Sequence, residues 1–322
     1  GERESTASDK LEQELREISD VPYFGENYKN SYFGEVCLNG EGRQQQWPPP
    51  AKFCCLSDDV PMIDVLELLG WKNTCWKLGQ PSVIISVTGS AKGLDLDRRL
   101  EHDLAQGLSE AVGYTGGWVI TGGTNTGVMA IVGKALRQRN LTRFGSMDFV
   151  PVIGVAMLQR TTQYEKFHSN AIRHELDKLK ERGAEQFDPY VCQVGYPKNS
   201  KDPDGFAGLD SGHTHFLLVD NGSDEGAEVS WNCEVKLRAQ LEKKICDVYG
   251  ASGIQIVVQG SIGTLKTVDE SLEFRMMVVL VADSGGAARL IAELIEPLLG
   301  GAMSDTEREK HVADKLADKD SK

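Results

Sequence analysis

The stretch VIISVTGS, residues 83–90, sets the first expectation for the fold of this chain. Its opening residues are almost all apolar, which is typical of a strand buried on both faces of a parallel sheet. Leucines then recur at four-residue spacing from Leu96 to Leu108 and predict an amphipathic helix, for which Asp95 is the expected N-cap. An apolar strand followed by such a helix is the repeating unit of an α/β fold.

The same alternation continues toward the C-terminus. Further apolar runs predict strands at residues 118–120, 152–156, 216–219, 254–258 and 277–281. We therefore predict an α/β, Rossmann-like, doubly wound and mainly parallel sheet with helices on both faces. This domain is expected to span residues 82–302, with an insertion at about 157–212 that is partly helical near 172–180. Residues 1–81 are expected to be an extension of loops and short helices, and 303–322 a charged helix or tail.

Composition excludes several classes of protein. The chain has 322 residues and a net charge of -13, which disfavours nucleic acid and anionic lipid as partners. Its seven cysteines are odd in number and form no C-x-x-C pair, which favours reduced thiols over disulfides or a zinc ribbon. The longest apolar run, residues 276–282, is far shorter than the roughly 20 residues of a membrane span. With no signal-peptide pattern, we expect a cytosolic segment that does not contact the membrane.

Glycine and hydroxyl residues gather in four turns, each of which follows a predicted strand and opens a helix. In open parallel sheets, ligands bind beyond the carboxyl ends of the strands. Glycine lets the backbone approach a phosphate, and a helix N-terminus offers free N–H donors. The predicted binding residues of these turns are Thr88, Gly89, Ser90 and Lys92; Gly122, Gly123, Thr124, Asn125, Thr126 and Gly127; Gly260, Ser261, Gly263 and Thr264; and Ser284 and Gly285.

Each turn taken alone is also compatible with a tight strand-to-helix connection. The spacings match neither the G-x-G-x-x-G dinucleotide motif, nor a Walker loop, nor a G-x-S-x-G nucleophile elbow. His213 and His215 form an H-x-H pair that could lie on one face of a strand and bind a metal. No third ligand stands out in the sequence, so we expect polar residues at a strand entrance and no metal site.

Four motifs resemble the N-terminal cytosolic region of melastatin-type (TRPM) cation channels. They are VTGSAK at residues 87–92, ITGGTNTGVM at 120–129, LDSGHTHFLLVDNG at 209–222 and GSIGTLKT at 260–267. The motifs occur in the same order as in the family, and the resemblance covers about residues 30–297. It implies a SLOG/LSDAT domain, a Rossmann-like group of nucleotide-derivative sensors that also includes lonely-guy-type hydrolases. It is closest to the ADP-ribose-gated branch of the channels.

The resemblance also implies a ligand and its contacts. Trp231, Glu234 and Arg238 match positions of an ADP-ribose site, where Trp231 would stack on adenine and Arg238 would clamp a phosphate. From the residues alone, Trp231 could equally be a core aromatic, and Arg238 a surface cation paired with Glu234. The family's arginine after the last strand is replaced by Gly286, and Arg289 one turn later is the candidate to compensate.

Related hydrolases carry a catalytic glutamate where this chain has Thr267. Without that carboxylate the turn lacks an acid/base group, so we expect binding without catalysis and no catalytic cofactor. The leading hypothesis is a sensing domain that binds ADP-ribose or a related adenine nucleotide. Its other expected partners are the rest of a tetrameric channel and the neighbouring subunits, on the cytoplasmic side of a membrane. The alternatives are a nucleotide N-glycosidase or phosphoribohydrolase, and a subunit-assembly domain without ligand.

Overall fold

A computed structural model of residues 1–322 shows the fold. The structure describes residues 32–38, 50–69, 76, 78–91, 93–142, 149–164, 167, 190–193, 205–220 and 233–299, and positions 304, 306, 307 and 310. The four glycine-rich turns lie within these ranges, apart from Lys92. Trp231 and the helix expected near 172–180 lie outside the described residues, as does most of the charged C-terminal segment.

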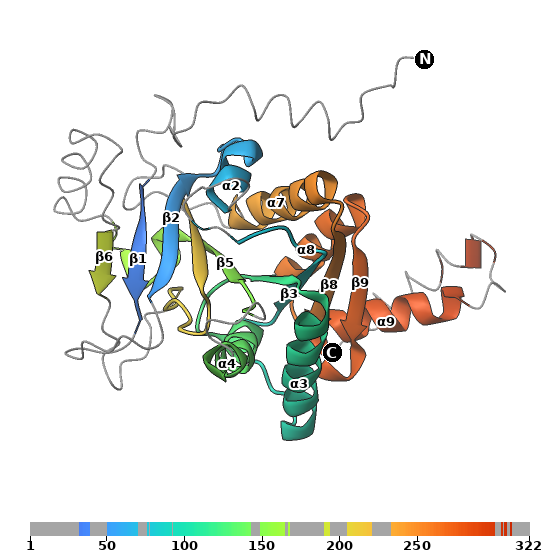
Figure 1. Ribbon diagram of the computed structural model, residues 1–322. Coiled ribbons are helices and arrows are strands. Elements are labelled where there is room, and N and C mark those ends of the chain that lie inside the picture. Colours follow the sequence, from blue (N-terminus) through green and yellow to red (C-terminus); the bar gives the residue numbers. More distant parts are fainter. Residues whose placement is uncertain are drawn as a thin grey trace, which may run out of the picture.

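The described residues form one nine-stranded sheet with the order β6-β1-β2-β7-β5-β4-β3-β8-β9 (Figure 1). Seven strands run parallel, whereas β1 and β6 pair in parallel with each other and run opposite to the rest. The prediction of a mainly parallel, Rossmann-like sheet is therefore confirmed. The strands are β1 Tyr32–Cys37, β2 Ala51–Ser57, β3 Val83–Gly89, β4 Trp118–Thr121, β5 Val152–Met157, β6 Tyr190–Gln193, β7 His215–Asp220, β8 Ser252–Val258 and β9 Met277–Val281.

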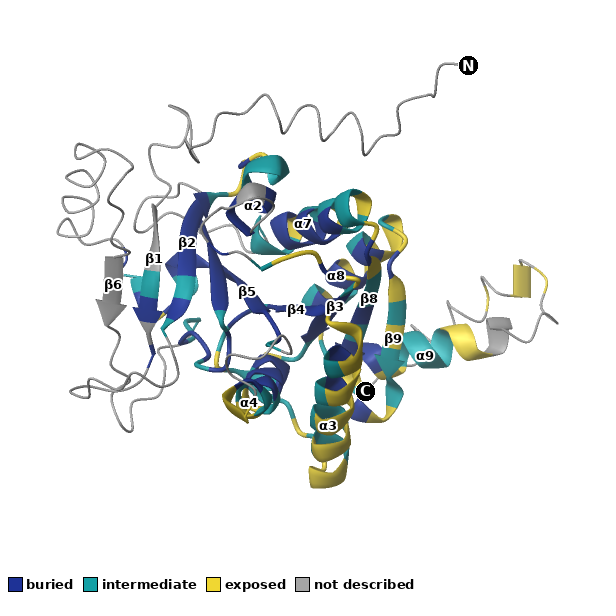
Figure 2. Ribbon diagram, viewed as in Figure 1, coloured by how far each residue is buried: buried dark blue, intermediate teal, exposed yellow. Residues whose placement is uncertain are grey.

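Helices cover both faces of this sheet. Helices α3 and α4 pack on one face in a buried cluster around Val87, Val112 and Leu136, whereas α2 and α7 pack on the other around Leu69, Ile84 and Leu241 (Figures 1 and 2). The helices are α2 Met62–Leu69, α3 Arg98–Thr115, α4 Gly127–Thr142, α7 Cys233–Tyr249, α8 Ile262–Glu273 and α9 Gly286–Leu299, and Leu158–Arg160 and Ala282–Ser284 form 3-10 turns.

The order of the strands also marks where a ligand site is expected. From β3 the chain proceeds to β4 on one side of the sheet, and it later returns to place β8 on the other side of β3. The connections that follow β3 and β8 therefore diverge to opposite faces, which opens a crevice at their carboxyl ends. Such a topological switch point is the usual ligand site in open α/β sheets.

Three strands were not anticipated from the sequence. β1 and β2 fall in the expected N-terminal extension and β6 in the expected insertion, yet all three belong to the same sheet. β2 is an inner strand whose pairing with β7 buries Phe53, Cys54 and Cys55 completely. Lys52 and the two cysteines make this segment look less apolar in the sequence than it is in the fold. The buried Cys54 and Cys55 thiols pack as small apolar side chains, so the segment is an apolar strand in the structure.

The N-cap of α3 also differs from the expectation. The helix begins at Arg98, and its N-cap is Asp97 rather than Asp95. The Asp97 carboxylate accepts hydrogen bonds from the backbone N–H groups of Arg99 at 2.8 Å and Leu100 at 3.0 Å. Asp95 and Asp97 both precede the same leucine stripe in the sequence. Which of them caps the helix depends on the backbone conformation, which places the carboxylate of Asp97 within reach of the N–H groups of the first turn.

Candidate functional site

The four glycine-rich turns meet at the carboxyl edge of β4, β3, β8 and β9. The N–H of Val128 donates to the carbonyl of Ser90 at 3.1 Å, and the N–H of Ser90 donates to the carbonyl of Val258 at 3.3 Å. At the next turn, the N–H of Ala287 donates to the carbonyl of Gly260 at 3.1 Å. Each turn is thus hydrogen-bonded to its neighbour, and the predicted residues that the structure describes in all four turns, Lys92 excepted, lie along one continuous edge.

Several of these glycines are required by the packing of one turn on another. A Cβ atom at Gly89 would come within 2.0 Å of the Val258 carbonyl oxygen, and one at Gly127 within 1.8 Å of the Ser90 oxygen. Gly123 has a φ of +69° and lies against the backbone of Gly154. Their lack of a side chain is therefore explained by the fold, without any ligand.

Gly122 and Gly263 are different. A Cβ atom at Gly122 would meet only Met129, no closer than 3.7 Å, and one at Gly263 would meet nothing within 4 Å. Neither residue has a positive φ. Gly263 also lies in the first turn of α8, where glycine disfavours the helix. Internal packing does not explain these two glycines, so the backbone at both positions is open to a ligand at the carboxyl edge.

The helix N-termini at this edge differ in what their N–H groups contact. At α9, the N–H groups of Ala287 and Ala288 donate to the carbonyls of Gly260 and Gln259. At α8, the N–H groups of Thr264 and Leu265 donate to the Ser261 carbonyl, and Ser261 N–H donates to Thr264 Oγ1 at 3.2 Å. The N-terminus of α9 is therefore committed to the neighbouring turn, whereas α8 begins with its own local cap.

The fourth turn is built mainly for internal contacts. The buried hydroxyl of Ser284 donates to the Val281 carbonyl and accepts the Gln259 N–H at 2.6 Å. Gly285 has a φ of +83°, so its backbone conformation calls for glycine. Arg289 pairs with Glu293 at 2.8 Å on the exposed side of α9. Because these groups already have partners within the protein, the β9 turn is less suited to bind a ligand than the β3, β4 and β8 turns.

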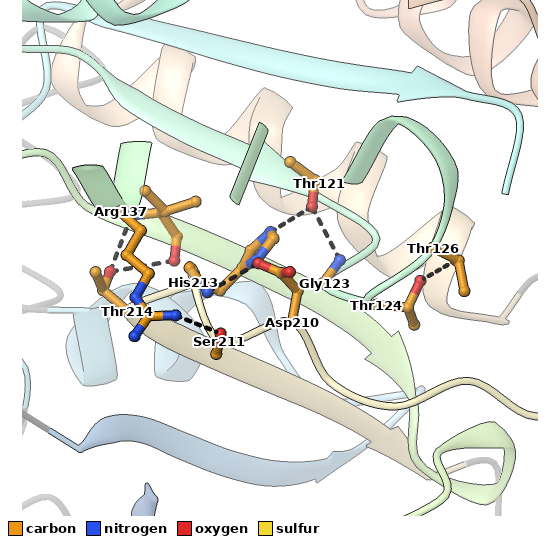
Figure 3. A network of polar contacts seen from close by, with 11 residues as sticks. Thr121, Gly123, Thr124, Thr126, Arg137, Asp210, Ser211, His213 and Thr214 are labelled. Atoms are coloured by element: carbon orange, nitrogen blue, oxygen red, sulfur yellow. Dashed lines mark hydrogen bonds and ion pairs between the residues drawn. The ribbon is translucent and has the colours of Figure 1, made fainter. Parts of the chain in front are cut away.

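The β4 turn is held by the segment that leads into β7. The N–H of Asn125 donates to the Gly208 carbonyl at 2.7 Å, and Thr124 forms an isolated antiparallel bridge with Leu209. The hydroxyls of Thr124 and Thr126 bond each other at 2.9 Å (Figure 3). The backbone of this turn is thereby fixed before any ligand binds.

Arg238 lies beneath the same edge, on the buried side of α7. Its Nε donates to Glu242 at 2.9 Å, and its Nη2 donates to Ser86 Oγ at 2.5 Å. Nη2 also faces the carbonyls of Val87 at 3.1 Å and Ile120 at 3.5 Å, near the ends of β3 and β4. The partner of this guanidinium is therefore Glu242 rather than Glu234, and it is buried rather than exposed as a surface cation would be.

Glu234 lies in the first turn of α7, beside Cys233. Burial, with Glu234 and then Asp58 nearby, raises the pKa of the Cys233 thiol to about 12. The predicted stacking residue Trp231 precedes this turn, and like Lys92 it lies outside the described residues. Of the three positions matched to the ADP-ribose site, the structure therefore places Glu234 and Arg238 on one helix.

A second buried cluster supports the β4 turn and was not predicted from the sequence (Figure 3). Thr121 Oγ1 bonds His213 Nε2 at 2.7 Å, and His213 Nδ1 bonds Asp210 Oδ1 at 3.0 Å. Thr121 Oγ1 also accepts the N–H of Gly123 at 2.9 Å. Asp210 and His213 stand three residues apart in the motif at 209–222, and that spacing is the one signal in the sequence that points to the pair.

An aspartate, a histidine and a hydroxyl in this order form the relay of a nucleophilic hydrolase. Here all three side chains are buried, and Thr121 is 0% exposed. A substrate cannot reach a hydroxyl in that position, so the cluster holds the turn in place. Thr267, at the position of the hydrolase glutamate, is also buried, and its hydroxyl donates to the Gly263 carbonyl at 3.1 Å.

The two histidines of the H-x-H pair have different surroundings. His213 precedes β7 and bonds Thr121 and Asp210, whereas His215 begins β7, packs against the Trp76 ring and bonds Thr214 Oγ1 at 2.7 Å. Burial, with Lys52 nearby, lowers the pKa of His215 to about 3. Within the described ranges, no cluster of three or more His, Cys, Asp or Glu side chains is arranged to hold a metal ion.

None of the helices in the described part of the chain combines the length and apolar character needed to cross a bilayer.

Comparison with known proteins identifies the family. Residues 51–317 match the model of a family described as SLOG in TRPM. The chain is 31% identical over 273 residues to a TRPM member-like 2 channel of Nematostella vectensis, covering 80% of this chain and 16% of the relative. It is 29% identical over 270 residues to TRPM member 2 of Rattus norvegicus, covering 81% and 16%, and 26% identical over 272 residues to TRPM member 5 of Homo sapiens, covering 81% and 21%.

The chain thus spans between a sixth and about a fifth of the length of these relatives, which are named as cation channels and not as hydrolases. The match runs from the start of β2 past the end of α9 and so includes the whole carboxyl edge described above. These names agree with the prediction of a domain that is not an enzyme. The chain belongs to the SLOG family of domains of TRPM cation channels.

Proposed function

We propose that this domain binds ADP-ribose or a closely related adenine nucleotide at the carboxyl edge of β3, β4 and β8, and that occupancy regulates the gating of a cation channel. The observation that carries the proposal is the pair of glycines, Gly122 and Gly263, that the fold itself does not require. Both are in turns at the carboxyl edge, close to the topological switch point. The names of the relatives support the channel, and the chemistry of the turns supports the ligand.

The β8 turn offers the most direct site for a phosphate. Ser261 is exposed, Gly263 has open space, and α8 begins at Ile262 at this edge. Because the N–H groups of Thr264 and Leu265 already donate to Ser261, the donors proposed for the phosphate are those of Ile262 and Gly263. A helix N-terminus favours an anion through its dipole and its donors. A nucleotide with two linked phosphates could extend from here toward Ser90 and the β4 turn. Ser90 is hydrogen-bonded both to the end of β8, at Val258, and to the start of α4, at Val128.

In this proposal Arg238 does not contact the ligand but supports the strand ends that form the site. Its guanidinium bonds the carbonyls near the ends of β3 and β4, and Glu242 balances its charge. Arg238 thereby fixes the spacing of the two strand ends that present Ser90 and Gly122. Trp231 and Glu234, at the start of α7, remain the proposed contacts for the base and ribose, and Lys92 and Arg289 the proposed cations at the rim.

A thermal-shift screen of the 322-residue chain tests the proposal against a panel of ADP-ribose, NAD, AMP and inorganic phosphate. A ligand that binds only the folded state raises the unfolding temperature by mass action, so the ranking of the shifts follows the ranking of affinities. We expect the largest shift with ADP-ribose and little or none with phosphate. The absence of a shift with every nucleotide at millimolar concentration would refute the proposed function.

A further inference from the structure

A buried polar layer lies between the centre of the sheet and helices α7 and α8. It consists of Ser86, Arg238, Glu242, Gln255 and Ser271, none of which is more than 7% exposed. Ser86 and Gln255 are directly paired in the register of β3 and β8, so their side chains point to the same face of the sheet. That face is the one covered by α7, because Ser86 Oγ donates to Glu242 Oε1 at 2.6 Å.

The members of this layer differ in their hydrogen bonding. Ser86, Arg238 and Glu242 bond one another, and the two charges are opposite. In contrast, both the amide nitrogen and the amide oxygen of Gln255 have no hydrogen-bond partner among the described residues, and the same holds for Ser271 Oγ. Gln255 is 0% exposed, so bulk water does not reach its amide.

The packing around Gln255 brings it to the level of Ser271. On the same face of β8, Gly253 lies against Met276 and Cys246, and Val257 packs in a cluster with Val268. Ser271 falls between Val268 and Met276 along the chain, and it lies on the buried side of α8. Gln255 is therefore flanked by α8 at Ser271 and by α7 at the Ser86–Glu242 pair.

We propose that this layer holds an internal water molecule that bridges the Gln255 amide, Ser271 Oγ and the Ser86–Glu242 pair. Buried polar groups in native proteins are almost always partnered, and an internal water forms about three hydrogen bonds to groups that otherwise lack a partner. The chemistry favours a neutral molecule that both donates and accepts. Gln255 and Ser271 each offer a donor and an acceptor, and Arg238 already balances the charge of Glu242.

A stability cycle tests this assignment with Gln255→Met, Ser271→Ala and the double variant of the 322-residue chain. If the water is present, each single substitution removes one of its partners and lowers the unfolding temperature by about 2–4 °C. The double variant then loses less than the sum, because both changes act on one water. If the layer is dry, removing each unpaired group leaves the temperature unchanged or raises it, and the effects add; that result overturns the proposal. Gln106→Met, at an exposed position of α3, is the control for the substitution itself.

A second measurement needs no variant and decides the matter where a variant does not fold. In the protein with ¹⁵N-labelled glutamine, water-selective NMR should show transfer between a long-lived water and the side-chain amide protons of Gln255. Gln255→Met assigns the signal by removing it where that variant folds. A Gln255 amide that is resolved but shows no transfer from water contradicts the proposal.

Discussion

The two faces of the sheet each bury one polar cluster beneath the same edge, and the two clusters are built differently. On the α4 side, Thr121, His213 and Asp210 form a short chain of hydrogen bonds that ends on the backbone of the β4 turn. On the α7 side, Arg238 and Glu242 form an ion pair that bonds Ser86 and the ends of two strands. The first cluster fixes one turn, whereas the second fixes the spacing between strands.

The residues that support the carboxyl edge are therefore different from those that could contact a ligand there. Both clusters are buried, so neither presents a free group to a nucleotide in this structure. Arg238, which was expected to bind a phosphate, lies below the carboxyl edge and bonds Glu242 and Ser86 instead. The binding surface that we propose consists of backbone, small side chains and the N-terminus of α8. The group removed is a hydroxyl in the first cluster and one partner of a buried ion pair in the second, which predicts different costs when each cluster is disrupted.

The largest effect is expected for Arg238→Met. This change leaves the Glu242 carboxylate buried without its cation, which typically costs about 3–5 kcal/mol of unfolding free energy. Urea denaturation of the wild type and the variant measures the loss. Arg289→Met is the matched control, because it removes a half-exposed pair with Glu293 that contributes at most about 1 kcal/mol. Equal losses in the two variants would show that Arg238 does not hold a buried pair.

His215 lies near the first cluster along the chain but outside its hydrogen bonds, and it should make stability depend on pH. Its pKa is about 3 in the folded protein against 6.5 in the unfolded chain, so only the unfolded state takes up a proton between these values. Its contribution is therefore complete above pH 6.5 and fades as the pH falls toward 3, by about 3 kcal/mol at pH 4.

Urea denaturation at pH 7, 5.5 and 4 follows this loss in the wild type and in His215→Gln. The variant should lose less stability on acidification than the wild type does. His102→Gln, at an exposed position of α3, should keep the wild-type dependence. A wild-type slope that persists in His215→Gln would assign the pH dependence to other groups.

A smaller effect is expected for Thr121→Val in the chain of hydrogen bonds formed by Thr121, His213 and Asp210. The substitution keeps the shape of the side chain but leaves His213 Nε2 and the Gly123 N–H without their partner, at a cost of about 1–3 kcal/mol. Because the β4 turn loses an anchor, nucleotide affinity should fall together with stability. Thermal unfolding and titration of this variant are compared with Thr115→Val, an exposed threonine of α3. Unchanged stability would show that the Thr121–His213–Asp210 cluster does not hold the β4 turn in place.

The fold was readable from the sequence wherever apolar runs were continuous. β3, β5, β8 and β9 are largely apolar runs, and a glycine-containing turn and a helix follow β3, β8 and β9. β2 was missed because Lys52 and the two cysteines interrupt the expected composition, although its pairing with β7 buries it. β6 is four residues long and lies at an edge, where little apolar character is needed.

The sequence predicted the glycine-rich turns of the candidate site but not the buried clusters that support them. The glycine turns are local, so their sequence reveals them. Arg238 has a glutamate four residues before it and another four residues after it, and the choice of Glu242 depends on Ser86, which lies 152 residues away. The Thr121–His213 bond likewise joins residues 92 apart, so only the folded chain brings them together.

Calorimetric titration of ADP-ribose into the wild type and Gly263→Ala is the most direct test of the proposed binding edge. Gly263 has open space and a helical position, so alanine should keep or raise stability by about 0.5–1 kcal/mol. If a phosphate approaches this backbone, the new methyl group should weaken binding about tenfold, the equivalent of roughly 1.4 kcal/mol. The account predicts measurable heat with the wild type and reduced affinity in a variant of equal or greater stability. No heat with the wild type at millimolar ligand, or identical affinity in the variant, would contradict it.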